Sequence, residues 1–190
     1  EPEARNTAPC ILLGLLHLLA NGAKNEDVVA IFPADHVILN RQGHEKTLKR
    51  AARLAGEQGK IVTIGIPPHY PHTGYGYIHR GEALKDHEAS FQVHSFKEKP
   101  NREVATTYLQ TGEYFWNAGL FVATIGCLLQ EFAQHAPDFY RVVPLIKSLY
   151  EKRQAQLLTS IEFAQKLKIL YQLFPANSID YAVMEKAENV

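Results

Sequence analysis

The sequence of 190 residues contains only two cysteines and one methionine, and its formal net charge is zero. Cys10 and Cys127 lie far apart, which excludes a disulfide framework and the paired spacing of a zinc site. This cysteine usage is typical of proteins in a reducing compartment, so we expect a cytoplasmic protein. A metal, if one binds, would need oxygen ligands.

The charges are balanced, with 20 Lys and Arg against 20 Asp and Glu. A chain without excess positive charge is a poor candidate for binding nucleic acid or an anionic membrane, although a local basic site could still hold one phosphate. The longest apolar run, residues 10–20, is shorter than the roughly 20 residues that a bilayer requires. We therefore predict no nucleic acid partner, no membrane span and a small ligand.

The ends of the chain indicate a piece of a longer protein. The first residue is Glu1, and the only methionine is Met184. No linker rich in Ser, Gly or Pro divides the sequence, so we predict that residues 1–190 belong to one domain.

The first half of the chain predicts an α/β fold. Residues 28–32 form a short apolar run that stops at Pro33, as in a buried parallel strand. Residues 43–58 have apolar side chains at helical spacing, with Gly59 as a stop, and residues 60–66 read as a second buried strand. This order predicts two parallel strands joined by a crossover helix.

Further elements follow from local patterns. Residues 8–20 predict a helix buried on most sides, capped by Asn6 or Thr7. Residues 91–96 alternate with period two, which predicts a half-buried strand, and a helix is expected over 101–111. The C-terminal third has mainly helical patterns.

Asp35 follows the first predicted strand directly, where ligands bind in open parallel sheets. Its carboxylate suits Mg²⁺, which takes one or two protein carboxylates and completes its shell with water and substrate phosphates. A turn or helix-cap role for Asp35 stays equally open. We expect the neighbouring His36 to be a packing or hydrogen-bonding residue rather than a metal ligand.

Two other motifs combine polar side chains with special backbone residues. Gly74 and Gly76 flank one tyrosine, which permits either close approach of a ligand or a tight turn. In the charged run that follows the strand at 91–96, Lys99 could bind a phosphate and Glu98 could accept hydrogen bonds from sugar hydroxyls. A solvated strand end explains the same charges.

A fourth motif pairs Asn117 with Gly119 inside a predicted strand over 115–124, which we expect to be broken at Gly119. The amide can donate and accept hydrogen bonds, and the glycine lets a sugar ring come close, but turn and core roles explain the pair equally well. A dinucleotide-dependent dehydrogenase has little support, because no Gly-x-Gly-x-x-Gly follows a strand.

In their order along the whole chain, these motifs resemble the mannose-1-phosphate guanylyltransferases, also called GDP-mannose pyrophosphorylases, of the bacterial type that is often fused to a mannose-6-phosphate isomerase domain. The matching runs are Arg5-Asn6-Thr7-Ala8-Pro9, Pro33-Ala34-Asp35-His36, Thr73-Gly74-Tyr75-Gly76-Tyr77-Ile78, Glu98-Lys99-Pro100, Trp116-Asn117-Ala118-Gly119-Leu120-Phe121 and Ser178-Ile179-Asp180-Tyr181-Ala182-Val183-Met184-Glu185-Lys186. The resemblance implies a Rossmann-like mixed sheet of the nucleotide-diphospho-sugar transferase type.

The resemblance also implies an activity and its site. GTP and mannose 1-phosphate would react by in-line attack, assisted by Mg²⁺, to give GDP-mannose and pyrophosphate. The catalytic residues implied are Asp35, which would also be the metal ligand, and Lys99. The residues implied for nucleotide binding are Arg5, Asn6, Thr7 and Ala8, with a structural role for Arg5 left open. Those implied for the sugar phosphate are Gly74, Glu98, Lys99, Asn117 and Gly119.

The sequence also departs from the family. The first strand and glycine-rich loop that cradle the triphosphate have no counterpart here, and a second metal-binding aspartate expected after the Met-Glu-Lys run is lacking. His72 stands where many relatives have an acidic residue, and Asp180 and Glu185 receive no assigned contacts. We therefore expect weak or no activity from this chain alone, and we expect a homo-oligomer, since a lost strand leaves unpaired backbone groups. The alternative is a non-catalytic subunit that binds a sugar phosphate or a partner chain.

Overall fold

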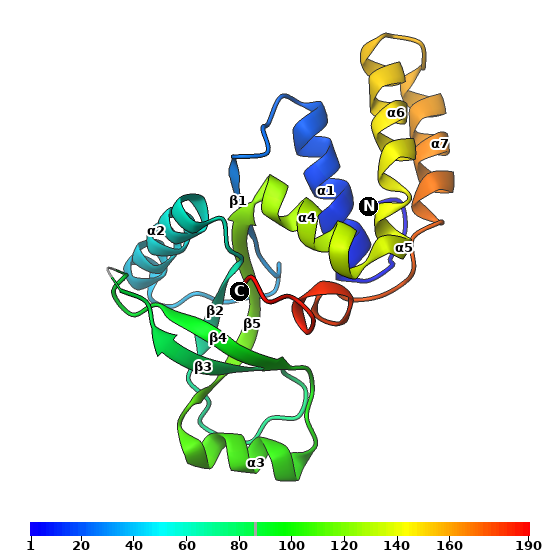
Figure 1. The fold of residues 1–190 in the computed structure, drawn as a ribbon. Helices are drawn as coiled ribbons and strands as arrows, with labels where there is room; N and C mark the ends of the chain where they lie inside the picture. Colours follow the sequence, from blue (N-terminus) through cyan, green and yellow to red (C-terminus); the bar gives the residue numbers. More distant parts are fainter. Residues whose placement is uncertain (86) are drawn as a thin grey trace. The chain divides into compact units, whose positions relative to one another are not determined.

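The computed structural model describes residues 1–85 and 87–190. Contacts between Cα atoms divide the chain into two compact units, coloured by sequence in Figure 1. The helical unit comprises residues 1–27 and 125–187, and the sheet unit comprises residues 28–124 and 188–190.

The sheet unit is a mixed α/β structure with a five-stranded sheet, which confirms the predicted fold class. Its elements are β1 (Val28–Ile31), α2 (Arg41–Gln58), β2 (Val62–Ile66), β3 (Tyr77–Ala83), β4 (Phe91–Lys97), α3 (Arg102–Thr111) and β5 (Tyr114–Thr124). The long strand β5 pairs antiparallel with β1, β2 and β3, and β3 pairs antiparallel with β4. The sheet is therefore organised around β5.

β1 and β2 run in parallel and are joined by α2, as predicted, but they do not pair with each other. Val122 of β5 lies opposite Ala30 of β1 and also opposite Val62 of β2, so β1 and β2 occupy opposite edges of β5. Both are antiparallel to β5 and hence run in the same direction. A strand from much later in the sequence separates the two strands that the crossover helix joins.

The two strands are also less buried than predicted. Positions in β1 alternate between exposed and half-buried, and β2 ends in the exposed residues Gly65 and Ile66. Phe32, just after β1, is 48% exposed. In the described residues β1 and β2 each pair only with β5, so an apolar sequence here does not produce a fully covered strand. β4 is likewise mostly exposed, with Val93 and Phe96 only half-buried.

A β-bulge interrupts the pairing of β5 where the sequence predicts a break. Thr63 lies opposite Phe121, whereas Gly65, two residues later, lies opposite Asn117. The extra residues of β5 include Gly119, whose φ of 66° is in the left-handed region that glycine adopts without strain. A bulge of this kind bends the strand and redirects its side chains, so Gly119 shapes one end of the sheet unit.

Two helices cover parts of the sheet. Ala51 and Ala55 of α2 pack on Val122, and Ala105 of α3 packs with Tyr77 and Trp116. The predicted ends of these helices are confirmed. α2 ends at Gly59, which has a left-handed φ of 62°, and α3 is capped by Asn101, whose Oδ1 accepts from the Val104 N–H at 2.9 Å.

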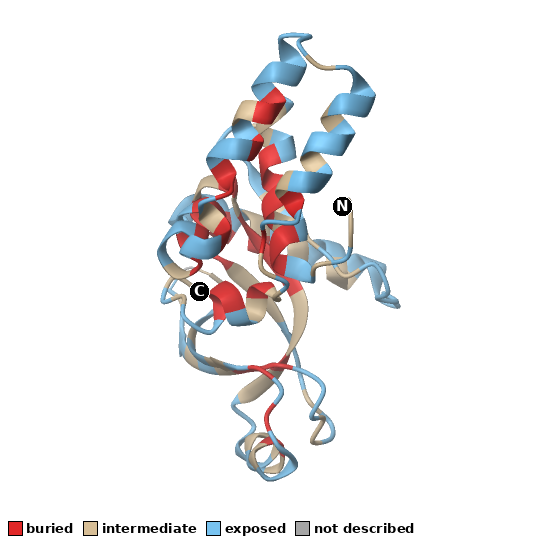
Figure 2. Cartoon of the chain, turned by 90° about the vertical axis from the view of Figure 1, so that its right-hand side faces the viewer, coloured by how far each residue is buried: buried red, intermediate tan, exposed pale blue. Residues whose placement is uncertain are grey.

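The helical unit confirms the predicted helical character of the C-terminal third. It contains α1 (Thr7–Ala20), α4 (Ile125–His135), α5 (Pro137–Tyr140), α6 (Val143–Gln154), α7 (Ser160–Tyr171) and the π-helix η1 (Asp180–Met184). Figure 2 shows how exposed the outer ends of α6 and α7 are. Over the described residues, none of the helices is both long and apolar enough to cross a bilayer.

Asn6 caps α1, and the helix is covered on most sides, both as predicted, with one exposed stripe that includes Thr7, Cys10 and Leu18. It buries Leu12, Leu16 and their neighbours, while Gly14 and His17 are exposed. An all-apolar run cannot reveal which face is covered, because no polar stripe marks the exposed side.

The outer edge of β1 leads us to expect concentration-dependent self-association, because unpaired strand edges pair with other chains. Ala30→Lys places a charge on an exposed position of β1 and should reduce the association measured by light scattering. Gln42→Lys adds the same charge on an exposed position of α2 and should not. A monodisperse monomer of the unchanged protein at high concentration would contradict this expectation.

Candidate functional site

Three of the motifs meet at one end of the sheet unit because of the strand register. β3 begins at Tyr77, which lies opposite Lys97 at the end of β4 and opposite Trp116 of β5. In an antiparallel sheet, the residue before Tyr77 therefore lies beside the residue after Lys97 and the residue after Trp116. These three neighbours are Gly76, Glu98 and Asn117.

Gly76, Glu98 and Asn117 are in close contact. The Asn117 N–H donates to the Gly76 carbonyl at 2.8 Å. A Cβ atom added to Gly76 would lie 2.5 Å from Oε2 of Glu98 and 3.3 Å from Cβ of Asn117. The Glu98 side chain thus occupies the space that any side chain at position 76 would need, and Glu98 is only 9% exposed.

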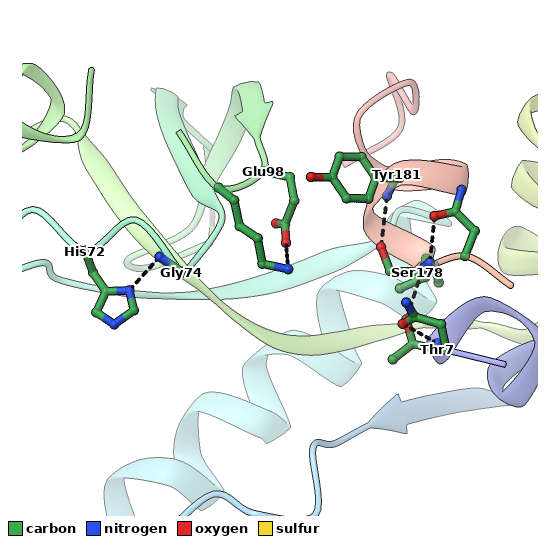
Figure 3. A network of polar contacts seen from close by, with 10 residues as sticks. Thr7, His72, Gly74, Glu98, Ser178 and Tyr181 are labelled. Carbon is green, nitrogen blue, oxygen red and sulfur yellow. Dashed lines mark hydrogen bonds and ion pairs between the residues drawn. The ribbon is translucent and has the colours of Figure 1, made fainter. Parts of the chain in front are cut away.

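Lys99 adds a positive charge to this cluster. Its Nζ lies 3.1 Å from Oε1 of Glu98, and a dashed line in Figure 3 marks this ion pair. Its backbone has a φ of 43°, in the left-handed region that costs a non-glycine residue roughly 1–3 kcal/mol. Such strain persists only where surrounding contacts hold it. The buried carboxylate and the half-exposed ammonium therefore form one charged cluster at this end of the sheet.

The Asn117 amide is oriented by its own neighbours. Oδ1 accepts from the Gly119 N–H at 3.0 Å and from the Thr63 hydroxyl at 3.4 Å. Because the Gly119 N–H can only donate, the oxygen of the amide is assigned without ambiguity. The bulge at Gly119 thus fixes the direction of the Asn117 side chain.

Asp35 lies on the exposed turn that follows β1. The turn starts at Pro33, whose Cγ would be 3.3 Å from a Cβ added to Gly119, so this segment passes beside the bulge. His36 is exposed, so of the two roles expected for it the packing role is wrong, while a hydrogen-bonding role stays a prediction. No group of three or more His, Cys, Asp or Glu side chains within residues 1–85 and 87–190 could hold a metal ion. Asp35 could therefore supply only one carboxylate to a metal.

Gly74 contacts His72. The Gly74 N–H donates to Nδ1 of His72 at 2.9 Å, and Figure 3 shows the two side by side. A Cβ on Gly74 would lie 2.7 Å from Cε1 of the same ring. The sequence analysis names Gly76 and His72 but does not predict the contact of Gly76 with Glu98 or that of His72 with Gly74. The spacing of an acceptor side chain two residues before a glycine was the signal available for His72.

The Arg5–Ala8 segment belongs to the helical unit, and Arg5, Thr7 and Ala8 have partners within that unit. Arg5 donates from Nη1 to the Phe174 carbonyl at 2.8 Å and pairs with Glu3. Hydrogen bonds from Gln172 and then Arg5 hold the pKa of the Glu3 carboxyl below its usual value. These contacts favour the structural role for Arg5 that the sequence left open.

Thr7 and Ala8 are tied to the segment before η1. The Thr7 hydroxyl accepts from the Ile179 N–H at 2.9 Å, and the Ala8 N–H donates to the Asn177 carbonyl at 3.2 Å. In Figure 3 Thr7 lies beside the turn with Ser178. The Thr7 N–H is also used, since it donates to Oδ1 of Asn6 at 2.8 Å. Asn6 is exposed, so a ligand can reach its amide.

A family model described as nucleotidyl transferase matches residues 1–160. The chain belongs to the nucleotidyl transferase family. It is 39% identical over 193 residues to mannose-1-phosphate guanylyltransferase 2 of Escherichia coli O157:H7, an alignment that covers 99% of this chain and 38% of that protein. The mannose-1-phosphate guanylyltransferase of Salmonella montevideo is 38% identical, with 100% of this chain and 38% of that protein covered. The predicted family is thereby confirmed.

Two solved structures resemble the chain as a whole. One is titled mannose-1-phosphate geranyltransferase, from Thermus thermophilus, with a TM-score of 0.82 and 32% identity over 100% of this chain and 50% of that one. The other is mannose-6-phosphate isomerase from Helicobacter pylori, with a TM-score of 0.72 and 28% identity over 98% of this chain and 67% of that one. The chain spans 38% of the length of its first curated relatives.

Gly76→Ala should lower the free energy of unfolding by about 1–3 kcal/mol, because the new methyl group collides with the Glu98 carboxylate. Gly14→Ala is the matched control. Gly14 is an exposed position inside α1 with open space around it, so alanine there should stabilise the protein by about 0.5–1 kcal/mol. Chemical denaturation measures both changes, and equal effects of the two substitutions would contradict the packing described at Gly76.

Proposed function

We propose that this chain takes part in the transfer of a guanylyl group from GTP to mannose 1-phosphate, as part of a single nucleotidyltransferase catalytic domain. One observation supports this proposal most strongly. Gly76, Glu98 and Asn117 lie together at one end of the sheet unit, and Lys99 forms an ion pair with Glu98. The names of the relatives support the choice of substrates.

In this proposal Lys99 and Glu98 bind different parts of the sugar phosphate. The ammonium of Lys99 binds the phosphate, while the carboxylate of Glu98 accepts hydrogen bonds from ring hydroxyls, as carboxylates do from vicinal hydroxyl groups. Gly119 has no side chain that would keep a sugar ring away from the backbone, while Gly76 lets the Glu98 carboxylate lie against the backbone. Asn117, held through its oxygen, contributes an amide whose orientation is fixed before the sugar arrives.

The reaction itself needs positioning and charge neutralisation rather than a protein nucleophile. An oxygen of the sugar phosphate forms a bond to the α-phosphorus of GTP. The bond from that phosphorus to the bridging oxygen breaks, and the electron pair leaves with pyrophosphate. Lys99 holds the attacking phosphate in place and offsets its negative charge.

The residues fit a Mg²⁺ ion that arrives with the triphosphate rather than one held by the protein alone. Asp35 offers a single exposed hard oxygen ligand, and Mg²⁺ is commonly held by one or two carboxylates together with substrate phosphates. The chemistry supplied by the bound ion would be neutralisation of charge on the phosphates. Asp35 would be its ligand from this chain.

For the nucleotide, we propose that Asn6 is the residue of the Arg5–Ala8 segment that contacts the base. The amides of Thr7 and Ala8 already donate within the helical unit, so they are poor candidates for reading a guanine edge. The Asn6 amide nitrogen can donate to the acceptors O6 and N7 of guanine.

We propose that turnover by this chain alone is weak, because no Gly-Gly pair or glycine-rich phosphate loop occurs in its 190 residues. Loss of a single preorganised phosphate donor commonly costs about a hundredfold in rate. An assay of pyrophosphate release from GTP and mannose 1-phosphate tests this. Turnover equal to that of a full-length relative would contradict it.

The proposed sugar-phosphate site is tested by calorimetry with mannose 1-phosphate and with mannose. Lys99→Met should weaken binding of mannose 1-phosphate by roughly tenfold or more and weaken mannose much less, since the phosphate contact is lost for the first ligand whereas the ion pair with Glu98 is lost for both. Glu98→Gln should weaken both ligands, because the hydroxyl contacts are lost. Lys97→Met, which removes the same charge from an exposed position two residues away, is the control and should change neither.

Unchanged binding of mannose 1-phosphate by Lys99→Met would contradict the proposed role of Lys99. Equal losses of affinity in Lys99→Met and Lys97→Met would mean that binding depends only on the total positive charge near the site and not on a contact with Lys99. Binding of mannose 1-phosphate without any turnover in the complete parent protein would favour the non-catalytic subunit instead.

A further inference from the structure

The loop before β3 is fixed by one imidazole. His72 accepts the Gly74 N–H on Nδ1 at 2.9 Å, a contact from a side chain to the backbone two residues later. Asparagine and aspartate make this same contact in turns. Because Nδ1 accepts, the proton of a neutral His72 ring must lie on Nε2.

The ring of His72 is held from several sides. It stacks on Tyr75 with 4.0 Å between ring centroids and an interplanar angle of 15°. Tyr70 and Trp116 approach it edge-on, at centroid distances of 5.4 Å and 6.3 Å. The backbone carbonyl of His72 accepts from the hydroxyl of Tyr77, a residue that is 0% exposed. The acceptor atom is therefore well fixed relative to the start of β3.

The loop leads directly into the proposed sugar-phosphate site. Two residues after Gly74, the carbonyl of Gly76 accepts from Asn117, and the Cα of Gly76 faces the Glu98 carboxylate. A change in the backbone conformation of residues 72–76 would move Gly76. The Glu98 carboxylate packs against Gly76, so its position would change as well.

We propose that His72 is a positioning residue for the sugar phosphate, acting through the Nδ1 acceptor that holds the Gly74 amide. This inference rests on the proposed function, since it deepens the role of the same site. His72 fixes the loop, and the loop fixes Gly76 against Glu98. The acceptor atom carries the role, and ring stacking on Tyr75 is secondary.

Two substitutions separate the acceptor from the ring. His72→Asn keeps an acceptor oxygen at the place of Nδ1 and removes the ring. His72→Phe keeps a ring that can stack on Tyr75 and removes the acceptor. Calorimetry should give a dissociation constant for mannose 1-phosphate within about twofold of the unchanged protein for His72→Asn, and roughly tenfold higher for His72→Phe.

The amide spectrum of the protein supplies a second readout that needs no ligand. In ¹H–¹⁵N NMR, His72→Phe should shift the amide signals of Gly74, Gly76 and Asn117, while His72→Asn should leave Gly76 and Asn117 close to their original positions. Long-range ¹H–¹⁵N correlations should show Nδ1 of His72 without a proton. The dispersed remainder of the spectrum reports whether each variant is folded.

The outcomes are distinguishable. If the unchanged protein does not bind mannose 1-phosphate, the proposed function fails, and the amide shifts still test the hold of His72 on the loop. Unmoved Gly76 and Asn117 signals in His72→Phe would overturn the inference. So would equal losses of affinity in His72→Asn and His72→Phe, since the ring and not the acceptor would then be responsible.

Discussion

The burial of the Glu98 carboxylate against the backbone of Gly76 is the constraint on which the proposed site depends. A carboxylate that is 9% exposed is costly unless charged or polar groups surround it, and Lys99 provides such a partner at 3.1 Å. The contact requires glycine at position 76, and the register of β3 and β4 sets it. The packing against Gly76 and the ion pair with Lys99 thus both determine the position of the Glu98 carboxylate.

Two residues near this contact have positive φ values, Lys99 and Gly119. Each lies close to a side chain that we propose for sugar recognition. Gly119 adopts this conformation freely, whereas Lys99 requires support from its surroundings. Bulges are common next to active sites, where they change the direction of a side chain. Strand β5, with Asn117 held by the bulge at Gly119, fits that pattern.

The sequence predicted the α/β class, several ends of the helices α1, α2 and α3, and the motifs that converge in the sheet unit. Caps such as Asn6 and Asn101 are local, so they can be read from neighbouring residues. The insertion of β5 between β1 and β2 could not be, because it depends on pairing with a strand about 60 residues later than β2. The hydrogen bond between His72 and Gly74 was not predicted, since its one signal in the sequence, an acceptor side chain two residues before a glycine, was not used. The binding roles of Asp35, Asn6, Glu98, Lys99 and Asn117 remain predictions.

The central claim is that the end of the sheet unit around Gly76 binds a sugar phosphate. Chemical-shift mapping with mannose 1-phosphate tests it most directly, because every backbone amide reports separately. The account predicts that the largest changes occur at Gly76, Glu98, Lys99 and Asn117, and that mannose without its phosphate leaves Lys99 nearly unchanged. Changes confined to other surfaces, such as the exposed basic residues of α2, would contradict the account.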